Sequence, residues 1–391
     1  MRLKLKETPE QVELIKAMGS RNATAAREAQ EAFAAFLGPV VQEVLGVAGT
    51  ASRIYSDSPF DEDDSPSYPL DLYYNESAGY VTVWSQNMAG GLPSSQVEGV
   101  AEMKIATYRI DSAVSFLKRY ARKSRLDVVS KALERMSQEV LLKQERNAWA
   151  VILRALAEAK TKTSIDNETK HLIHCADSNG VITGEGNAGS GADLSELKLA
   201  DFSRLLTRMR RLNESFAQGT PDSVYSNGIT DLYVSPEMKE HIRAFAYNPM
   251  NTKGTNTDIA LPDNMREGIY NNAGMQEIYG VNIIELLELG KGKKYNALYD
   301  SFTTGQGNGG GYGVSNFTSG SDEVMVGVDN SKGAFVRAVS RQAESGGTFS
   351  ALPDDQFNLN RTDRTGFYGF LEEGRVCIDA RALAGMVFRH Q

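Results

Sequence analysis

The sequence predicts an α+β protein, and three observations support this class. A helical pattern runs from Ser124 to Lys160 without glycine or proline, and its apolar residues recur mostly three or four positions apart. Two extended segments with a turn-rich tip between them precede it, as in a hairpin-like arm. After it, strand and helix signals alternate to the C-terminus. We therefore expect a long helix and an arm joined to a compact α/β region.

The first part of the chain is expected to be a helical arm. Ala25 to Leu37 is rich in alanine, glutamate and glutamine, and these residues favour helix. Gly38-Pro39 is expected to break this helix, and Val40 to Leu45 is expected to resume it. The acidic, proline-punctuated stretch from Gly46 to Pro69 predicts irregular structure.

The hairpin-like arm follows. Tyr80 to Trp84 consists of residues that favour strand, Ala89 to Pro93 is turn-rich, and Val97 to Ile110 returns as a second extended segment. A two-stranded arm has little core of its own and is marginal in isolation. At about 1.5 Å per residue, the helix that comes next would span roughly 50 Å. Such a helix beside such an arm indicates a subunit that is built to contact neighbouring subunits.

Two more helices are expected in the C-terminal half. An amphipathic stripe from Phe202 to Phe216 predicts the first. Ser235-Pro236-Glu237 is expected to open the second, which runs to Ala246. In this opening the serine acts as the cap, the proline takes the first position and the glutamate lies at the positive end of the helix dipole.

The strands of this half are predicted from short apolar or alternating runs. Asp329 to Gly333 has the composition of a hairpin turn, and it is expected to join the flanking strands Val324–Val328 and Ala334–Val339. The other strand candidates are Asp231–Val234, Gly280–Leu287, Tyr295–Ser301, Gly366–Ile378 and Leu383–Phe388.

The composition limits the classes of function. The 391 residues, 41% of them hydrophobic, can bury one or two cores. A net charge of −8 argues against a dedicated nucleic-acid binder, which is usually basic on at least one face. Two cysteines fit a reducing compartment. No apolar run of about 18 residues is present, and the first residues lack the pattern of a signal peptide, so we expect neither a membrane span nor secretion.

The charges are unevenly distributed. Asp61, Glu62, Asp63 and Asp64 form an acidic run. A basic cluster crowds eight positions and consists of Lys118, Arg119, Arg122, Lys123 and Arg125. The cluster could contact phosphates or could be a solvated face beside the long helix. We favour a third hypothesis, in which it contacts the acidic run of an adjacent copy, because opposite charges steer and align interfaces.

No active site emerges from the motifs. Gly184, Gly186 and Gly189 imitate a dinucleotide-binding loop, but the next helix begins some ten residues later. His171, His174 and Cys175 offer metal-ligand chemistry without a fourth partner, so no cofactor or metal is expected. The acidic pair Glu372-Glu373 is expected to lie in a solvated turn. A cytoplasmic nucleotide- or metal-dependent enzyme is therefore kept only as a weaker alternative.

Taken in order, these elements resemble the major capsid protein of tailed double-stranded DNA phages, whose fold is shared with herpesvirus capsid floors and bacterial encapsulins. The most specific stretch is Gly366 to Phe388, with aromatic and glycine residues, an acidic turn, Asp379-Ala-Arg-Ala382 and a closing apolar strand. The resemblance implies an N-terminal arm at 1–65 and an extended loop at 66–102. It implies a peripheral domain that consists of 103–194, with a spine helix at 127–159, and of about 340–380. An axial α/β domain would comprise 195–339 and 381–391.

The resemblance also implies a function. It implies a structural protein, not an enzyme, that assembles as hexamers and pentamers into an icosahedral shell around the phage genome without sequence-specific DNA binding. Such a protein belongs to the virion, is assembled in the host cell cytoplasm, and has scaffolding, portal and cement or decoration proteins as partners. Since the extended loop would lie over a neighbouring subunit, Trp84, Met88 and Leu92 join the candidate inter-subunit contacts. An encapsulin-like shell that encloses cargo enzymes is the alternative.

Overall fold

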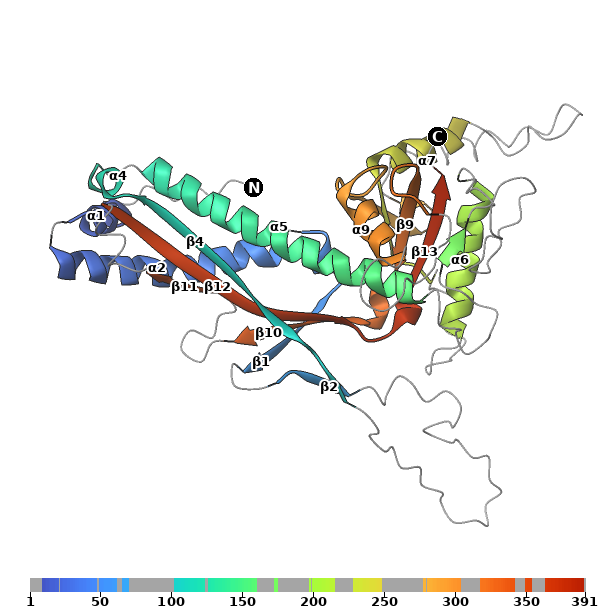
Figure 1. The fold of residues 1–391 in the computed structure, drawn as a ribbon, viewed down its shortest axis with the longest axis horizontal. Helices are drawn as coiled ribbons and strands as arrows, with labels where there is room; N and C mark the ends of the chain where they lie inside the picture. Colours follow the sequence, from blue (N-terminus) through green and yellow to red (C-terminus); the bar gives the residue numbers. More distant parts are fainter. Residues whose placement is uncertain are drawn as a thin grey trace, which may run out of the picture. The chain divides into compact units, whose positions relative to one another are not determined.

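The fold divides into two compact units (Figure 1). The computed structural model describes residues 9–20, 22–47, 49–61, 65–69, 102–123, 126–159, 172–174, 197, 199–214, 228–247, 277–278, 280–303, 317–341, 349–353 and 363–389. Unit 1 comprises Met1–Tyr68, Lys104–Ala148 and Val336–Val376, and unit 2 comprises Pro69–Met103, Trp149–Phe335 and Cys377–Gln391. Three separate chain segments build each unit, so neither corresponds to one continuous stretch of sequence.

A long antiparallel strand pair dominates unit 1. Strand β4 (Thr107–Leu117) pairs with β12 (Arg364–Cys377) in an unbroken register from Leu117↔Arg364 to Thr107↔Gly374. The other neighbours of β12 are β11 (Ser350–Pro353) and β10 (Phe335–Arg341), and β10 in turn pairs in parallel with β1 (Ser56–Asp61).

Helices cover one face of this sheet. They are α1 (Pro9–Met18), α2 (Ala23–Val47), the short α4 (Lys118–Arg122) and the first part of α5 (Leu126–Ala159). At the centre of the core, the centre of the Phe367 ring lies 5.2 Å from the ring centre of Phe33 in α2 and 6.3 Å from that of Phe116 in β4. Burial of these aromatic side chains joins the N-terminal helices to the sheet.

The predicted long helix is confirmed. Helix α5 contains 34 residues, and its apolar stripe is buried from Val129 to Leu156. Ser124, at which the predicted helical pattern begins, lies outside the described residues. The stripe supplies side chains to both units, because residues up to Ala148 belong to unit 1 and those from Trp149 belong to unit 2.

The predicted helix break at Gly38-Pro39 is wrong, since α2 continues from Ala23 to Val47. A proline inside a helix costs about 3 kcal/mol. Leu37 and Val41, on either side of it, are each 1% exposed in the same core. Tertiary packing on both sides of the proline offsets the lost backbone hydrogen bond.

The irregular structure predicted for Gly46–Pro69 is also wrong in part. The stretch contains the 3₁₀ turn η1 (Ala51–Arg53), strand β1 and the short strand β2 (Ser67–Pro69). The residues of β1 have low strand propensity. The edge of β10 supplies the hydrogen-bonding partners that this segment needs, over six residue pairs from Ser56↔Val336 to Asp61↔Arg341.

Unit 2 is built on a six-stranded mixed sheet with the order β5 (Leu172–His174), β13 (Leu383–Arg389), β9 (Asp322–Val328), β6 (Asp231–Val234), β8 (Val281–Glu285) and β7 (Glu277–Ile278). In the described part of this unit, the helices are the second part of α5, α6 (Leu199–Glu214), α7 (Pro236–Tyr247) and α9 (Lys294–Thr303). The predicted cap of α7 is confirmed, because the Met238 amide donates to the Ser235 hydroxyl at 3.0 Å.

Two predictions for unit 2 are wrong. Tyr295–Ser301 belongs to helix α9, whose Tyr295, Tyr299 and Thr303 are buried at a spacing of four residues. Strands β9 and β10 exist, but they do not form a hairpin. They lie in different sheets, because β13 and β6 already occupy the two edges of β9. The turn η3 (Asn330–Lys332), capped by the Asp329 carboxylate, carries the chain from one sheet to the other.

The base of the predicted arm is described, but the arm is not. Strand β2 pairs with β3 (Glu102–Lys104), so the chain leaves and returns at neighbouring strands. The predicted strand Tyr80–Trp84 and the tip Ala89–Pro93 lie outside the described residues, as does the glycine motif at 184–189. The boundaries predicted for the arm, the loop and the two domains stay predictions.

Candidate functional site

One end of unit 1 is strongly basic. We define the basic tip as α4 with the residue that follows it, the first residue of β12 and the last turn of α1. Its cations are Lys16, Lys118, Arg119, Arg122, Lys123 and Arg364. The β4–β12 register sets Arg364 opposite Leu117, the residue directly before α4. Figure 1 shows α4 at the end of this strand pair, with α1 beside it.

Contacts within the chain hold the tip in place. The Arg122 guanidinium donates to the Gly19 carbonyl at 2.8 Å and pairs with Asp363 at 3.4 Å. The backbone of Asp363 in turn accepts from the Lys118 amide at 2.9 Å. A Cβ atom on Gly19 would lie 2.7 Å from the Arg122 amide nitrogen, so only glycine lets α1 approach α4 this closely.

Among the sequence-predicted contact residues, the structure brings Lys118, Arg119, Arg122 and Lys123 together at the tip. Asp61 is exposed and ends β1, away from the tip. Arg125, Glu62, Asp63, Asp64, Trp84, Met88 and Leu92 lie outside the described residues. The contact between the acidic run and the basic cluster therefore stays a prediction.

Three members of this region were not predicted from the sequence. Lys16, Asp363 and Arg364 are far from α4 in the sequence, and the pairing of β4 with β12 and of α1 with α4 brings them there. No local pattern in the sequence signals this arrangement.

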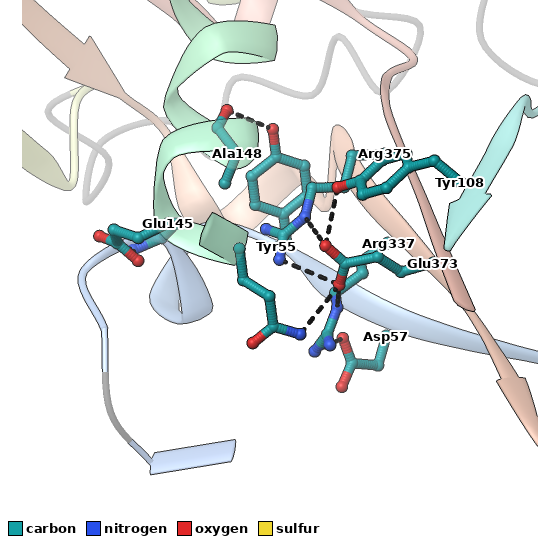
Figure 2. A network of polar contacts seen from close by, with 10 residues as sticks. Tyr55, Asp57, Tyr108, Glu145, Ala148, Arg337, Glu373 and Arg375 are labelled. Carbon is teal, nitrogen blue, oxygen red and sulfur yellow. Dashed lines mark hydrogen bonds and ion pairs between the residues drawn. The ribbon is translucent and has the colours of Figure 1, made fainter. Parts of the chain in front are cut away.

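A buried charge network lies at the other end of the β4–β12 pair (Figure 2). We define it as Glu373 with its four partners. The Glu373 carboxylate is fully buried, pairs with Arg337 of β10 at 2.8 Å and with Arg375 at 3.2 Å, and accepts from Tyr108 of β4 at 2.7 Å. Gln144 of α5 also donates to it, at 3.2 Å. The prediction of a solvated turn at Glu372-Glu373 is wrong, because both residues lie inside strand β12.

Electrostatics keep this network charged. Burial by itself would raise the pKa of the Glu373 carboxyl, but the guanidinium groups of Arg375 and Arg337 and the Tyr108 hydrogen bond outweigh it and lower the pKa below its usual range. Burial, reinforced by the neighbouring carboxylate, raises the pKa of Tyr108 to about 12. Glu373 is therefore an ionised acceptor and Tyr108 a protonated donor at neutral pH.

The network also fixes the segment that leads into β1. Asp57 pairs with Arg337 at 3.4 Å, and the Arg375 guanidinium lies 4.9 Å from the centre of the Tyr55 ring. The Tyr55 hydroxyl donates to the Ala148 carbonyl of α5 at 3.0 Å. Figure 2 shows this segment beside the network, whose labelled residues come from β4, β10 and β12.

The segment that leads into β1 is also held by a second carboxylate, that of Glu145 on α5. Glu145 accepts from the backbone amides of Thr50 at 2.9 Å and Ala51 at 3.1 Å, and from the Thr50 hydroxyl. These bonds satisfy the free N–H groups at the start of η1. Glu145 and Glu373 thus both act as structural anchors.

The described residues do not form an obvious catalytic centre. In the part of the chain that the structure covers, no group of three or more His, Cys, Asp and Glu side chains could hold a metal ion. Burial raises the pKa of the Cys377 thiol to about 12, so the thiol stays protonated and unreactive. No described helix is long and apolar enough to span a bilayer. His171 and Cys175 lie outside the described residues.

Comparisons with known proteins identify the fold. No family model matches the chain, and no curated protein matches it. Among solved structures, the capsid of cyanophage P-SCSP1u is similar over 87% of this chain and 88% of its own, with a TM-score of 0.50 and 12% identity. A structure of Microbacterium phage Oxtober96 is similar over 87% of this chain and 90% of its own, with 13% identity and a TM-score of 0.44. The SrpI encapsulin of Synechococcus elongatus PCC 7942 is similar over 85% of this chain and 85% of its own, with 11% identity and a TM-score of 0.41.

The first of these matches shows the fold of the chain. The chain has the fold of tailed-phage capsid proteins, as the resemblance in the sequence predicted. At 12% identity this similarity shows the fold alone, so the function is inferred separately.

Proposed function

We propose that this chain is the major capsid protein of a tailed double-stranded DNA phage. Its role is structural: copies assemble as hexamers and pentamers into an icosahedral shell that encloses the genome. The observation that supports this most is the match to a phage capsid structure over 87% of this chain and 88% of the other. The sequence resemblance rests on the order of elements along the chain, so it supports the same function from a different observation.

The described side chains fit an architectural role. The charged side chains in the interior of unit 1 brace strands and helix, and Glu373 has each of its two oxygens engaged by protein groups. The net charge of −8 also suits the wall of a container for DNA, because strong attraction would hinder release of the genome. In this proposal the protein resides in the virion, is assembled in the host cytoplasm, and contacts scaffolding, portal and cement proteins.

Expression of the chain alone and with candidate scaffolding proteins tests this function. Size-exclusion chromatography and negative-stain electron microscopy are expected to show hexamers or closed shells. A small oligomer that persists under all these conditions would contradict the proposal. Shells purified from the native host that contain an enzyme cargo in place of DNA would instead indicate the encapsulin-type alternative.

Deletion of Gly79–Gly99 is expected to separate folding from assembly. Strands β2 and β3 pair at the base of this segment, so a short glycine-serine turn can rejoin the chain there. We expect a soluble subunit with wild-type circular dichroism that fails to close shells, because the predicted arm is stabilised only on a neighbour. Particles of wild-type appearance from this deletion would refute the role of the arm. Replacement of 79–99 by a Gly/Ser linker of equal length is the control for chain length.

A further inference from the structure

We infer that the free edge of strand β4 is a contact surface for a second copy of this chain, and that the β4 strands of the two copies pair antiparallel across a two-fold axis. This inference rests on the proposed function and adds one interface to it. Icosahedral symmetry includes two-fold axes, and at such an axis the same surface of two identical copies meets. Three properties of β4 lead to the inference: its open edge, its composition and the positions of its two charges.

Strand β4 lies at an edge of its sheet. Among the strands that the structure describes, it pairs only with β12, and the Lys118 amide continues this pair by donating to the Asp363 carbonyl. Because the backbone groups of successive strand residues point to opposite sides, the even-numbered residues of β4 point to β12. The odd-numbered residues from Thr107 to Leu117 point away from it, where no described strand receives their N–H and C=O groups. Four of these residues are exposed, namely Arg109, Asp111, Ala113 and Ser115.

The composition of β4 differs from that of the other two edge strands of this sheet. Strand β1 carries Asp57, Pro59 and Asp61, and β11 has only four residues and ends in Pro353. Short length, proline and charge are the usual means by which an edge strand avoids pairing with another chain. Strand β4 has eleven residues without proline, and its two charged residues have opposite signs. An edge of this kind is a template for the addition of a further strand.

The positions of the two charges favour a second copy of the same strand as the partner. Arg109 and Asp111 lie two positions apart, so they share one face and one edge of β4. When two copies pair antiparallel and symmetrically about Ile110, Arg109 of each copy lies opposite Asp111 of the other, and both charge pairs are attractive. The registers shifted by two residues set either Arg109 opposite Arg109 or Asp111 opposite Asp111, and like charges directly opposite destabilise a strand pair. The charges therefore select one register, which we call the favoured register.

The side chains beside this edge are also ordered before a partner binds. Arg109 donates to Asp111 at 2.7 Å and to the Tyr368 hydroxyl at 2.8 Å, and its guanidinium lies 4.1 Å from the centre of the Phe370 ring. The Tyr368 hydroxyl in turn donates to Asp111 at 2.6 Å. Arginine and tyrosine are enriched among the residues that contribute most to binding at protein interfaces. Side chains that are already ordered lose less conformational freedom on association, which favours binding.

Disulfide cross-linking tests the contact and its register. In the favoured register, Thr107 of one copy lies opposite Ala113 of the other, with Cα atoms about 5.5 Å apart, a distance that a disulfide can bridge. Within one chain these two positions are roughly 20 Å apart in an extended strand, so they cannot bond to each other. The variant Thr107→Cys/Ala113→Cys is therefore expected to form covalent dimers in assembled shells under mild oxidation, as measured by non-reducing gel electrophoresis.

The matched control is Thr107→Cys/Ser115→Cys. Its cysteines face each other only in the register that sets Asp111 opposite Asp111, so it should cross-link at least about tenfold less. The wild-type chain, which keeps Cys175 and Cys377, gives the background.

Charge changes on the strand test the same contact through assembly. Arg109→Asp sets acidic residues opposite each other in the favoured register, so it should lower the assembled fraction at least about tenfold by light scattering and sedimentation. The swapped pair Arg109→Asp/Asp111→Arg restores opposite charges across the axis and should recover most of the assembly. A swapped pair that recovers none of it would overturn the choice of a second β4 strand as the partner.

The outcomes distinguish this inference from the proposed function. A wild-type chain that forms no shell contradicts the proposed function. Shells in which Thr107→Cys/Ala113→Cys gives no covalent dimer, or no more than the Ser115 control, overturn only the inference. Should Arg109→Asp unfold the subunit, the cross-linking result alone decides.

Discussion

Glu373→Ala is expected to lower the free energy of unfolding by about 3–5 kcal/mol, because it leaves two guanidinium groups buried without their carboxylate. Arg375 and Arg337 keep only 5% and 15% of their side-chain surface exposed, so water cannot replace the lost partner. The Tyr108 hydroxyl and the Gln144 amide lose their acceptor as well. Urea denaturation followed by circular dichroism measures the change.

Glu372→Gln is the matched control for this variant. Glu372 is the preceding residue of the same strand, is half-buried and accepts from the Thr107 hydroxyl at 2.7 Å. A glutamine can still accept this bond, so we expect a loss below about 1 kcal/mol. Equal losses in the two variants would show that the buried network is not a special source of stability.

The same network predicts a pH dependence. The pKa of Glu373 is lower in the folded than in the unfolded state. Its stabilisation is therefore fully present above the unfolded pKa of about 4.3 and is lost as pH falls through the depressed folded pKa. The difference between wild type and Glu373→Gln should stay constant from pH 7 to about pH 5 and shrink below about pH 4. A difference that already shrinks near pH 6 would contradict this assignment.

Trp149→Ala is expected to destabilise unit 2 by about 3–5 kcal/mol through the cavity that it creates. The indole is fully buried. Its ring centre lies 4.8 Å from that of Tyr233, in an edge-to-face arrangement, and 5.9 Å from that of Tyr295. Such aromatic pairs contribute roughly 0.5–1.5 kcal/mol beyond the area that they bury. Thermal and urea denaturation both report the loss.

Leu287→Ala is the control for this second variant. Leu287 is also a large apolar residue of unit 2, but 76% of its surface is exposed, so its removal should change stability by no more than about 0.5 kcal/mol. A loss for Trp149→Ala as small as that for Leu287→Ala would mean that the interior of unit 2 repacks freely around the missing ring.

Local signals predicted several elements well. The 3.6-residue period of α5, the Ser235 cap of α7 and the apolar run of β13 each depend on neighbouring residues, and each was confirmed. The order of these elements was sufficient for the capsid resemblance. Tyr295–Ser301 failed because a short apolar run does not distinguish strand from helix.

Other features depend on residues far apart in the chain. The turn at Asp329–Gly333 has good hairpin chemistry, yet its flanking strands pair in different sheets. The basic cluster was visible in the sequence, but Arg364 and Asp363 join it only through the register of β12 with β4. Local charge counts could not have found these residues.

By itself, the sequence determined the long helix, most strands and the capsid-type order of elements, because periodicity and capping act over a few residues. Only the tertiary structure decided that Glu373 is buried and charged, since its partners Tyr108 and Arg337 come from distant strands. It likewise decided that Pro39 stays inside a helix, because packing on both sides compensates for a break that local chemistry favours. Burial and pairing sum contributions from the whole chain, and these contributions outweigh local preferences at such positions.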